Sequence, residues 1–117
     1  MDALKDLEVW RRACRFSADV YCLLADCRDS GFRDQLGRSA LSIASNIAEG
    51  YERTSVKERA HYLKIAKGSS GEAWTQLLIG MEAGFLNRAE GLKKADEARQ
   101  ISKMLYRLIE YIEGSRL

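Results

Sequence analysis

The sequence has no proline and only one histidine among its 117 residues. Proline is the strongest helix breaker, and its absence leaves long helices possible, while the abundant Ala, Leu, Arg, Glu and Lys favour them. These features predict an all-α protein and argue against a β-sandwich or barrel. A chain of this length with 46% hydrophobic residues can bury one core, so we expect residues 1–117 to form a single domain.

Long hydrophobic runs and an export signal are also missing. The apolar runs are only a few residues long, far short of the roughly 20 that cross a bilayer, and the first six residues carry acids where a signal peptide has bases. The three cysteines, Cys14, Cys22 and Cys27, include no Cys-x-x-Cys pair, which argues against a disulfide framework and a structural zinc site. We therefore expect a cytoplasmic protein with no membrane partner.

Signatures of catalysis are absent as well. The single histidine, His61, belongs to no His-Glu-x-x-His or Glu-x-x-His pair, and no Gly-x-Ser-x-Gly motif occurs. Residues 67–72 are rich in Gly and Ser, but they lack the spacing of a phosphate-binding loop and fall inside a helical pattern. The sequence therefore predicts a protein that is not an enzyme and that carries no metal and no cofactor.

Apolar residues recur at steps of three and four in four segments, at about residues 7–24, 33–49, 55–84 and 91–114. Because short connections join segments of similar length, this pattern predicts an antiparallel up-and-down four-helix bundle. The predicted core positions are Leu7, Trp10, Cys14, Ser17, Tyr21 and Leu24, beside a seam of Val9, Ala13, Phe16, Val20 and Leu23; Leu36, Ala40, Ile43 and Ile47; Leu63, Ala66, Ser70, Ala73, Leu77 and Met81; and Ala98, Ile101, Leu105, Leu108 and Ile112.

Polar and glycine residues indicate where these helices begin and end. We expect Asp6 to cap the first helix, residues 29–31 (Asp-Ser-Gly) to stop it, and Gly50 to end the second. Thr54 or Ser55 precedes the third segment, and Glu58 would complete a capping box with Ser55. The third helix contains two glycines, which predict a kink or a close helix contact: Gly68 and Gly71.

A run of basic residues is the main candidate for a binding surface. Between positions 53 and 67 there are five Lys or Arg residues and one acid, Glu58, in a chain whose formal net charge is only +2. On a helix, one side of this run would carry Lys57, His61, Lys64 and Lys67, with Arg53 in the preceding loop. For one copy, an ordinary charged surface is the alternative, but a symmetric assembly would multiply the stripe into an anion-binding surface.

Two polar clusters can serve either as solvated faces or as contacts between helices or subunits. The first cluster, on the second segment, comprises Arg38, Ser42, Ser45 and Glu49, with Asn46 at its edge. The second comprises Glu72 and Gln76, one turn apart, which we expect to hydrogen-bond across to another helix and fix its register.

Several stretches of the sequence resemble one bacterial family. They are residues 6–10, residues 42–50, and residues 62–69 followed by Glu72 and residues 75–77. On these residues, over about positions 6–112, the chain resembles the four-helix-bundle proteins of the 23S rRNA intervening-sequence type. The resemblance implies a homopentameric ring and no established reaction. The family is also similar to the accessory variability protein of diversity-generating retroelements, a pentamer whose basic surface engages nucleic acid and a reverse transcriptase.

The functional expectation is a non-catalytic oligomeric scaffold that binds RNA or DNA weakly through phosphate contacts. The alternative is a protein–protein interaction module with no nucleic-acid ligand. Five aromatic residues do not all fit in one narrow core, and this predicts that the protein is not a monomer, with some of them at subunit contacts: Trp10, Tyr51, Tyr62, Trp74 and Phe85.

Overall fold

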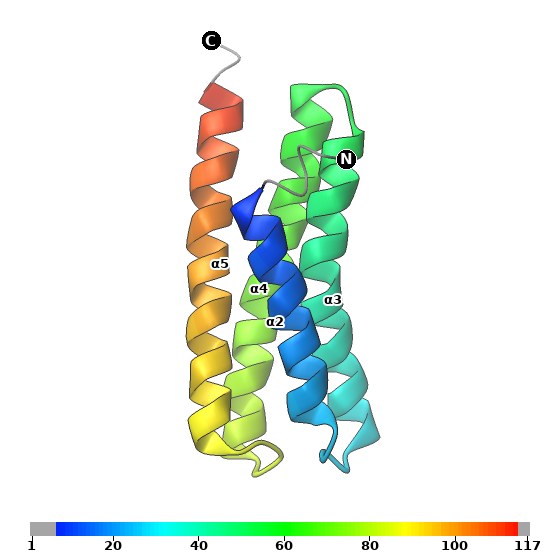
Figure 1. The fold of residues 1–117 in the computed structure, drawn as a ribbon, viewed down its shortest axis with the longest axis vertical. Coiled ribbons are helices and arrows are strands. Elements are labelled where there is room, and N and C mark those ends of the chain that lie inside the picture. Colours follow the sequence, from blue (N-terminus) through cyan, green and yellow to red (C-terminus); the bar gives the residue numbers. More distant parts are fainter. Residues whose placement is uncertain (1–6, 115–117) are drawn as a thin grey trace.

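Four helices account for most of residues 7–114, which are the residues that the computed structural model describes. They are α2 (Glu8–Leu24), α3 (Ser30–Glu52), α4 (Val56–Glu82) and α5 (Arg88–Gly114). Successive helices run in opposite directions and form a rod of 48 × 22 × 21 Å (Figure 1). The predicted all-α, antiparallel up-and-down four-helix bundle is therefore confirmed.

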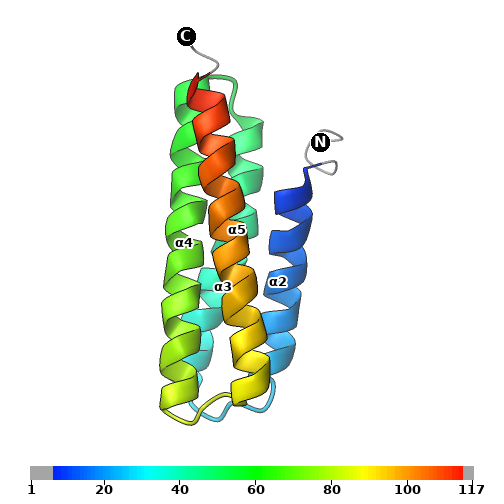
Figure 2. The same ribbon diagram turned by 90° about the vertical axis from the view of Figure 1, so that its left-hand side faces the viewer.

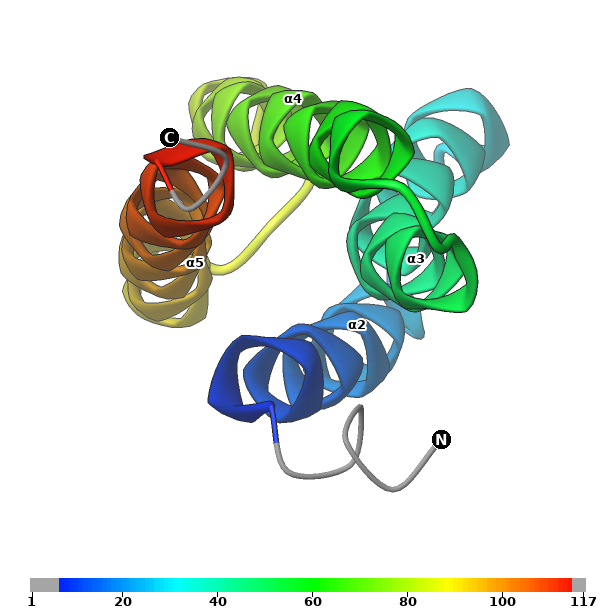
Figure 3. The same ribbon diagram turned by 90° about the horizontal axis from the view of Figure 1, so that it is seen from above.

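The four helices surround one core, with α2 between α3 and α5 (Figure 3). Helix α2 has 17 residues and α4 and α5 have 27 each, so the turns at one end of the bundle extend beyond α2 (Figure 1). An ion pair joins α2 to α5, because Arg12 Nη2 lies 2.6 Å from Glu97 Oε1. The hydrogen bond to the Glu97 carboxylate raises the pKa of Arg12.

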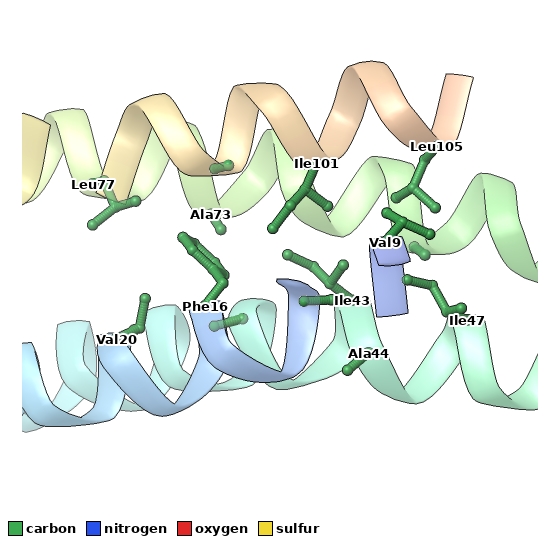
Figure 4. Close-up of a cluster of buried hydrophobic side chains, with 14 of the residues drawn as sticks. Val9, Phe16, Val20, Ile43, Ala44, Ile47, Ala73, Leu77, Ile101 and Leu105 are labelled. Atoms are coloured by element: carbon green, nitrogen blue, oxygen red, sulfur yellow. The ribbon is translucent and has the colours of Figure 1, made fainter. Parts of the chain in front are cut away.

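Apolar side chains from every helix fill the centre of the bundle (Figure 4). The predicted core positions of α3 are fully buried, as are most of those on α4 and α5. On α2 the predicted core positions are confirmed only in part. The seam of Val9, Ala13, Phe16 and Val20 is buried, and so are Ser17 and Leu24 of the neighbouring stripe. Tyr21, which was predicted in the core, is 48% exposed.

The boundary between α2 and α3 differs from the prediction. Helix α2 ends at Leu24, and Asp29 begins α3 instead of stopping α2, since its side chain accepts a hydrogen bond from the Phe32 N–H at 2.9 Å. An Asp at this position satisfies an unpaired N–H of the first helical turn. The predicted cap of α2, Asp6, lies outside the described residues. Helix α2 follows Leu7, which makes no side-chain cap.

Gly50 does not end α3, which continues to Glu52. A Cβ at Gly50 would lie 3.2 Å from the carbonyl oxygen of Arg59 and 3.3 Å from Cβ of Tyr62, so the glycine lets α3 and α4 approach closely at this end. The predicted cap at the start of α4 is confirmed, because Ser55 Oγ accepts from the Glu58 N–H at 3.1 Å. Glu58 Oε1 accepts from Ser55 Oγ and not from the Ser55 backbone N–H, so the second bond of the predicted capping box differs.

The turn between α4 and α5 also corrects one boundary. Helix α4 ends at Glu82, and Ala83 is its C-cap. The next residue, Gly84, has a φ of +77°, a conformation that glycine adopts without strain and that turns the chain out of the helix. Helix α5 begins at Arg88, three residues before the predicted start, because Asn87 Oδ1 accepts the Glu90 N–H at 3.0 Å and caps the first turn.

Gly68 and Gly71 neither interrupt α4 nor permit a contact between helices of the described chain. The helix is continuous from Val56 to Glu82, and a Cβ at either glycine would meet nothing within 4 Å. The predicted close contact at these two glycines is therefore wrong for residues 7–114, and the alternative, a kink, stays a prediction. These positions instead leave a stretch of the outer surface of α4 without side chains.

The glycines of α4 provide a matched test of packing. Gly68→Ala is expected to raise the free energy of unfolding by about 0.5–1 kcal/mol, because it adds helix propensity in open space. Gly80→Ala is expected to lower it by about 1–3 kcal/mol, since its Cβ would overlap the Phe32 ring and lie 2.7 Å from Leu86 Cδ1. Urea denaturation measures both changes. Equal shifts in the same direction would contradict the described packing of this helix.

Four of the five aromatic residues predicted at subunit contacts are half-buried at the edges of the bundle, and Phe85 is exposed. Several have partners within the chain: the Phe85 ring lies 5.2 Å from that of Phe32, and the Arg59 guanidinium lies 4.4 Å from the centre of the Tyr51 ring. The bundle therefore accommodates part of each ring without a second subunit, and the contribution of these residues to subunit contacts stays a prediction.

Candidate nucleic-acid interface

The predicted basic stripe lies along the outer side of α4. Ser55 caps the start of the helix, and the uninterrupted turns of α4 place Lys57, His61 and Lys64 at exposed positions. Lys67 is half-buried, because it lies on the side of α4 that faces α5. The helix therefore brings these four residues onto adjoining parts of one surface.

Two of the predicted binding residues have acidic partners. Lys64 Nζ lies 2.8 Å from Glu113 Oε2 on α5, although the Lys64 side chain is still 57% exposed. Arg53 Nη2 lies 2.9 Å from Glu49 Oε1, and this hydrogen bond raises the pKa of the guanidinium. Arg53 also lies 5.0 Å from the centre of the Tyr62 ring. Its position is that of a structural residue at the end of α3, with part of its charge neutralised.

Lys57 and Lys67 have no carboxylate at ion-pair distance among residues 7–114. His61 is exposed, and its ring packs edge-on against that of Tyr62 at 5.2 Å. Lys57 and Lys67 are therefore available to an external anion, together with the exposed part of Lys64.

A groove between α4 and α5 gathers further cations that the sequence analysis did not single out. Its volume is about 490 Å³. Figure 2 views the bundle from the side on which these two helices lie next to each other. The groove is lined by Lys67, Ser70, Gly71 and Trp74 from α4 and by Ala98, Arg99, Ser102, Lys103, Tyr106 and Arg107 from α5. Four of these side chains are cationic, and none is a carboxylate.

The α5 cations follow a simple spacing. Arg99, Lys103 and Arg107 are four residues apart, so successive turns of α5 carry them on one side of the helix. This regular spacing is a signal that the sequence contains. Acidic residues on the same segment offset these cations, so the net charge of the segment does not reveal them. Whether the three cations form a binding surface depends on which face of α5 borders α4.

Aromatic rings form part of the same groove. Trp74 is half-buried in its wall, and the Arg99 guanidinium lies 4.8 Å from the centre of the indole ring. Such cation–π contacts hold a guanidinium in place while leaving its charge intact. Tyr106 is 56% exposed at the groove. Fixed cations beside accessible rings can contact both phosphates and bases.

The polar cluster on α3 separates into parts with different contacts. Ser42 Oγ lies 2.9 Å from Ser69 Oγ on α4, and Asn46 Nδ2 donates to Ser42 Oγ at 2.9 Å. These residues therefore join two helices within the chain. Arg38 and Ser45 are exposed, and Glu49 pairs with Arg53.

Glu72 and Gln76 do not make the predicted hydrogen bond to another helix within residues 7–114. Glu72 is exposed. Gln76 Oε1 is buried and has no hydrogen-bond partner in the described part of the chain. The expected fixing of register by this pair is therefore wrong for the helices described, because Glu72 faces outward and the buried amide oxygen of Gln76 meets no donor.

The described residues hold no assembled metal or membrane site. Among residues 7–114, no three His, Cys, Asp or Glu side chains are grouped so that they could bind a metal ion, and no helix is long and apolar enough to span a bilayer. Burial raises the pKa of the Cys14 thiol, which disfavours the reactive thiolate.

The fold and the groove define a small α-helical bundle protein with a cationic surface. The profile of the 23S rRNA-intervening sequence protein family matches residues 5–107, and the chain belongs to this family. This finding confirms the resemblance on which the sequence analysis relied. The similarity to the retroelement accessory protein stays a prediction.

A solved structure shows the same fold. The chain is similar to the 1.70 Å crystal structure of a protein with unknown function from the S23 ribosomal protein family of Bacteroides thetaiotaomicron. The TM-score is 0.82 at 22% sequence identity, over 87% of this chain and 98% of that one. No curated protein matches the sequence.

Proposed function

We propose that the protein is a non-catalytic oligomeric scaffold that binds RNA or DNA through phosphate contacts on the α4–α5 groove. The observation that carries this proposal is the set of four cations around the groove without a lining carboxylate: Lys67, Arg99, Lys103 and Arg107. Phosphate contacts of this kind supply affinity with little dependence on base sequence. The same basic surface continues along α4 through Lys57, His61 and Lys64. Lys67 joins this stripe to the groove, because it belongs to both.

Self-assembly would strengthen such binding, because each copy contributes its own cations to one ligand. The exposed apolar side chains of α4, which include Ile65 and Ile79, and the open surface at Gly68 support a contact between copies. The proposed assembly is a homopentamer. Light scattering at micromolar concentration is expected to give several times the 13.2 kDa of one chain. A mass of one chain would contradict the scaffold.

Neutralising two groove cations tests the binding site. Lys103→Gln combined with Arg107→Gln is expected to weaken the binding of RNA or DNA about tenfold at low salt, because two phosphate contacts are lost. Fluorescence anisotropy with a labelled oligonucleotide measures the affinity. Both side chains are exposed, so circular dichroism should show an unchanged helical content.

A matched variant controls for the change in net charge. Arg88→Gln combined with Lys93→Gln removes the same two charges from exposed positions of α5 outside the groove. This control is expected to retain the affinity of the original protein within about twofold. Equal losses in the two double variants would show that net charge, and not the groove, governs binding.

A second candidate function is a protein–protein interaction module with no nucleic-acid ligand. It is favoured by exposed apolar side chains on several helices, which include Leu41, Ile65, Ile79 and Leu92. In this case neither double variant changes the recovery of a partner protein after nuclease treatment. Nucleic-acid binding that depends on Lys103 and Arg107 would favour the scaffold.

A further inference from the structure

The groove contains features that phosphate binding alone does not require. Trp74 forms part of its wall, and Tyr106 is 56% exposed beside Lys103 and Arg107. Apart from the stacking of Arg99 on the indole, no hydrogen bond or ring contact engages either aromatic side chain in the described chain. An exposed tyrosine ring among cations therefore offers a flat surface to a ligand that is both planar and anionic.

A nucleic-acid duplex cannot stack its bases on such a surface. In a double helix the bases are paired and stacked inside, so a protein reaches mainly the backbone and the base edges. Unpaired bases stack on aromatic rings and on guanidinium planes, and nearby Lys and Arg side chains follow the phosphates. The outer face of the Arg99 guanidinium, which lies over Trp74, and the ring of Tyr106 are surfaces of these two kinds.

The size of the groove supports a small ligand unit. Its volume of about 490 Å³ lies in the range of sites that hold single small molecules. Ser102 is half-buried in the wall and adds a hydroxyl that can bond to a base edge or a sugar. Gly71 has no side chain, so a ligand can approach the α4 side of the groove closely at this position.

We infer that the α4–α5 groove takes an unpaired nucleotide of a single strand, with its base on Tyr106 and Arg99 and its phosphate at Lys103 and Arg107. This inference rests on the proposed function and names its ligand class: a single strand, or an unpaired segment of a folded RNA, in preference to a duplex. Recognition is by stacking, so it depends little on base identity.

Three labelled probes of equal length test the inference by fluorescence anisotropy: a ten-nucleotide thymidine strand, the same strand with abasic sugars throughout, and the thymidine–adenine duplex. We expect the thymidine strand to bind at least about fivefold more tightly than either other probe, because only this strand has bases free to stack. Tyr106→Leu is expected to weaken binding of the thymidine strand about 5- to 150-fold and to leave the abasic strand unchanged.

Tyr111→Leu is the matched control, since Tyr111 is a 75% exposed tyrosine of α5 that does not line the groove. This variant should bind all three probes as the original protein does. If the abasic strand and the duplex bind as tightly as the thymidine strand, or if Tyr106→Leu changes nothing, the stacking inference is overturned. In that case Lys103→Gln with Arg107→Gln still tests the proposed function separately. If no probe binds at low salt, both are overturned.

Discussion

Phe16→Ala is expected to lower the free energy of unfolding by about 3–5 kcal/mol, which is the usual cost of removing a buried aromatic ring. Phe16 is 1% exposed and points from α2 into the space between the helices (Figure 4). Helix α2 is the shortest of the four, so this ring forms a large part of the surface that it buries. Urea denaturation followed by circular dichroism measures the change.

Tyr111→Ala provides the comparison for the Phe16 variant. It also removes an aromatic ring, but Tyr111 is among the exposed residues, and the expected change is within about 0.5 kcal/mol. Similar small losses in both variants would contradict the described packing of α2. A selective loss at Phe16 would show that the burial of this ring against the other helices, and not the removal of an aromatic side chain as such, stabilises the bundle.

Binding of a single strand is expected to weaken about 50-fold when salt is raised from 50 to 200 mM, if the four groove cations each contact one phosphate. The physical reason is that each contact releases a counterion from the strand, and this release favours binding less as the salt concentration rises. Anisotropy titrations at several salt concentrations measure this as the slope of log affinity against log salt.

The same titration identifies the cations responsible. Lys103→Gln with Arg107→Gln removes two of the four and should reduce the magnitude of the slope by about 1.4, whereas Arg88→Gln with Lys93→Gln should leave the slope unchanged. A slope near zero in the original protein would show that phosphates do not carry the binding. A slope that no groove variant changes would place the contacts elsewhere on the surface.

Much of the fold was predictable from the sequence, because burial on a helix requires apolar residues at steps of three and four. The stripe of α3 shows this directly, since Leu36, Ala40, Ile43 and Ile47 are all fully buried. Helix ends were less predictable. The side chain of Asp29 can follow one helix or begin the next, and the backbone around it decides which N–H group it reaches.

The candidate site was predictable only in part. The sequence placed Lys57, Lys64 and Lys67 on one side of a helix, but it did not indicate that Lys64 pairs with Glu113, which is 49 positions away. The cations of α5 were missed for the same reason. Arg99 and Lys103 become part of a surface with Lys67 only when the antiparallel register of α4 and α5 is known.

The sequence by itself determined four amphipathic helices, their order and the family, since each depends on residues close together along the chain. Only the tertiary structure decided which cations are neutralised, which glycines face open space and which rings border the α4–α5 groove. The physical reason is that charge pairing and packing depend on distances between side chains, and those distances are set by the rotation and register of one helix against another.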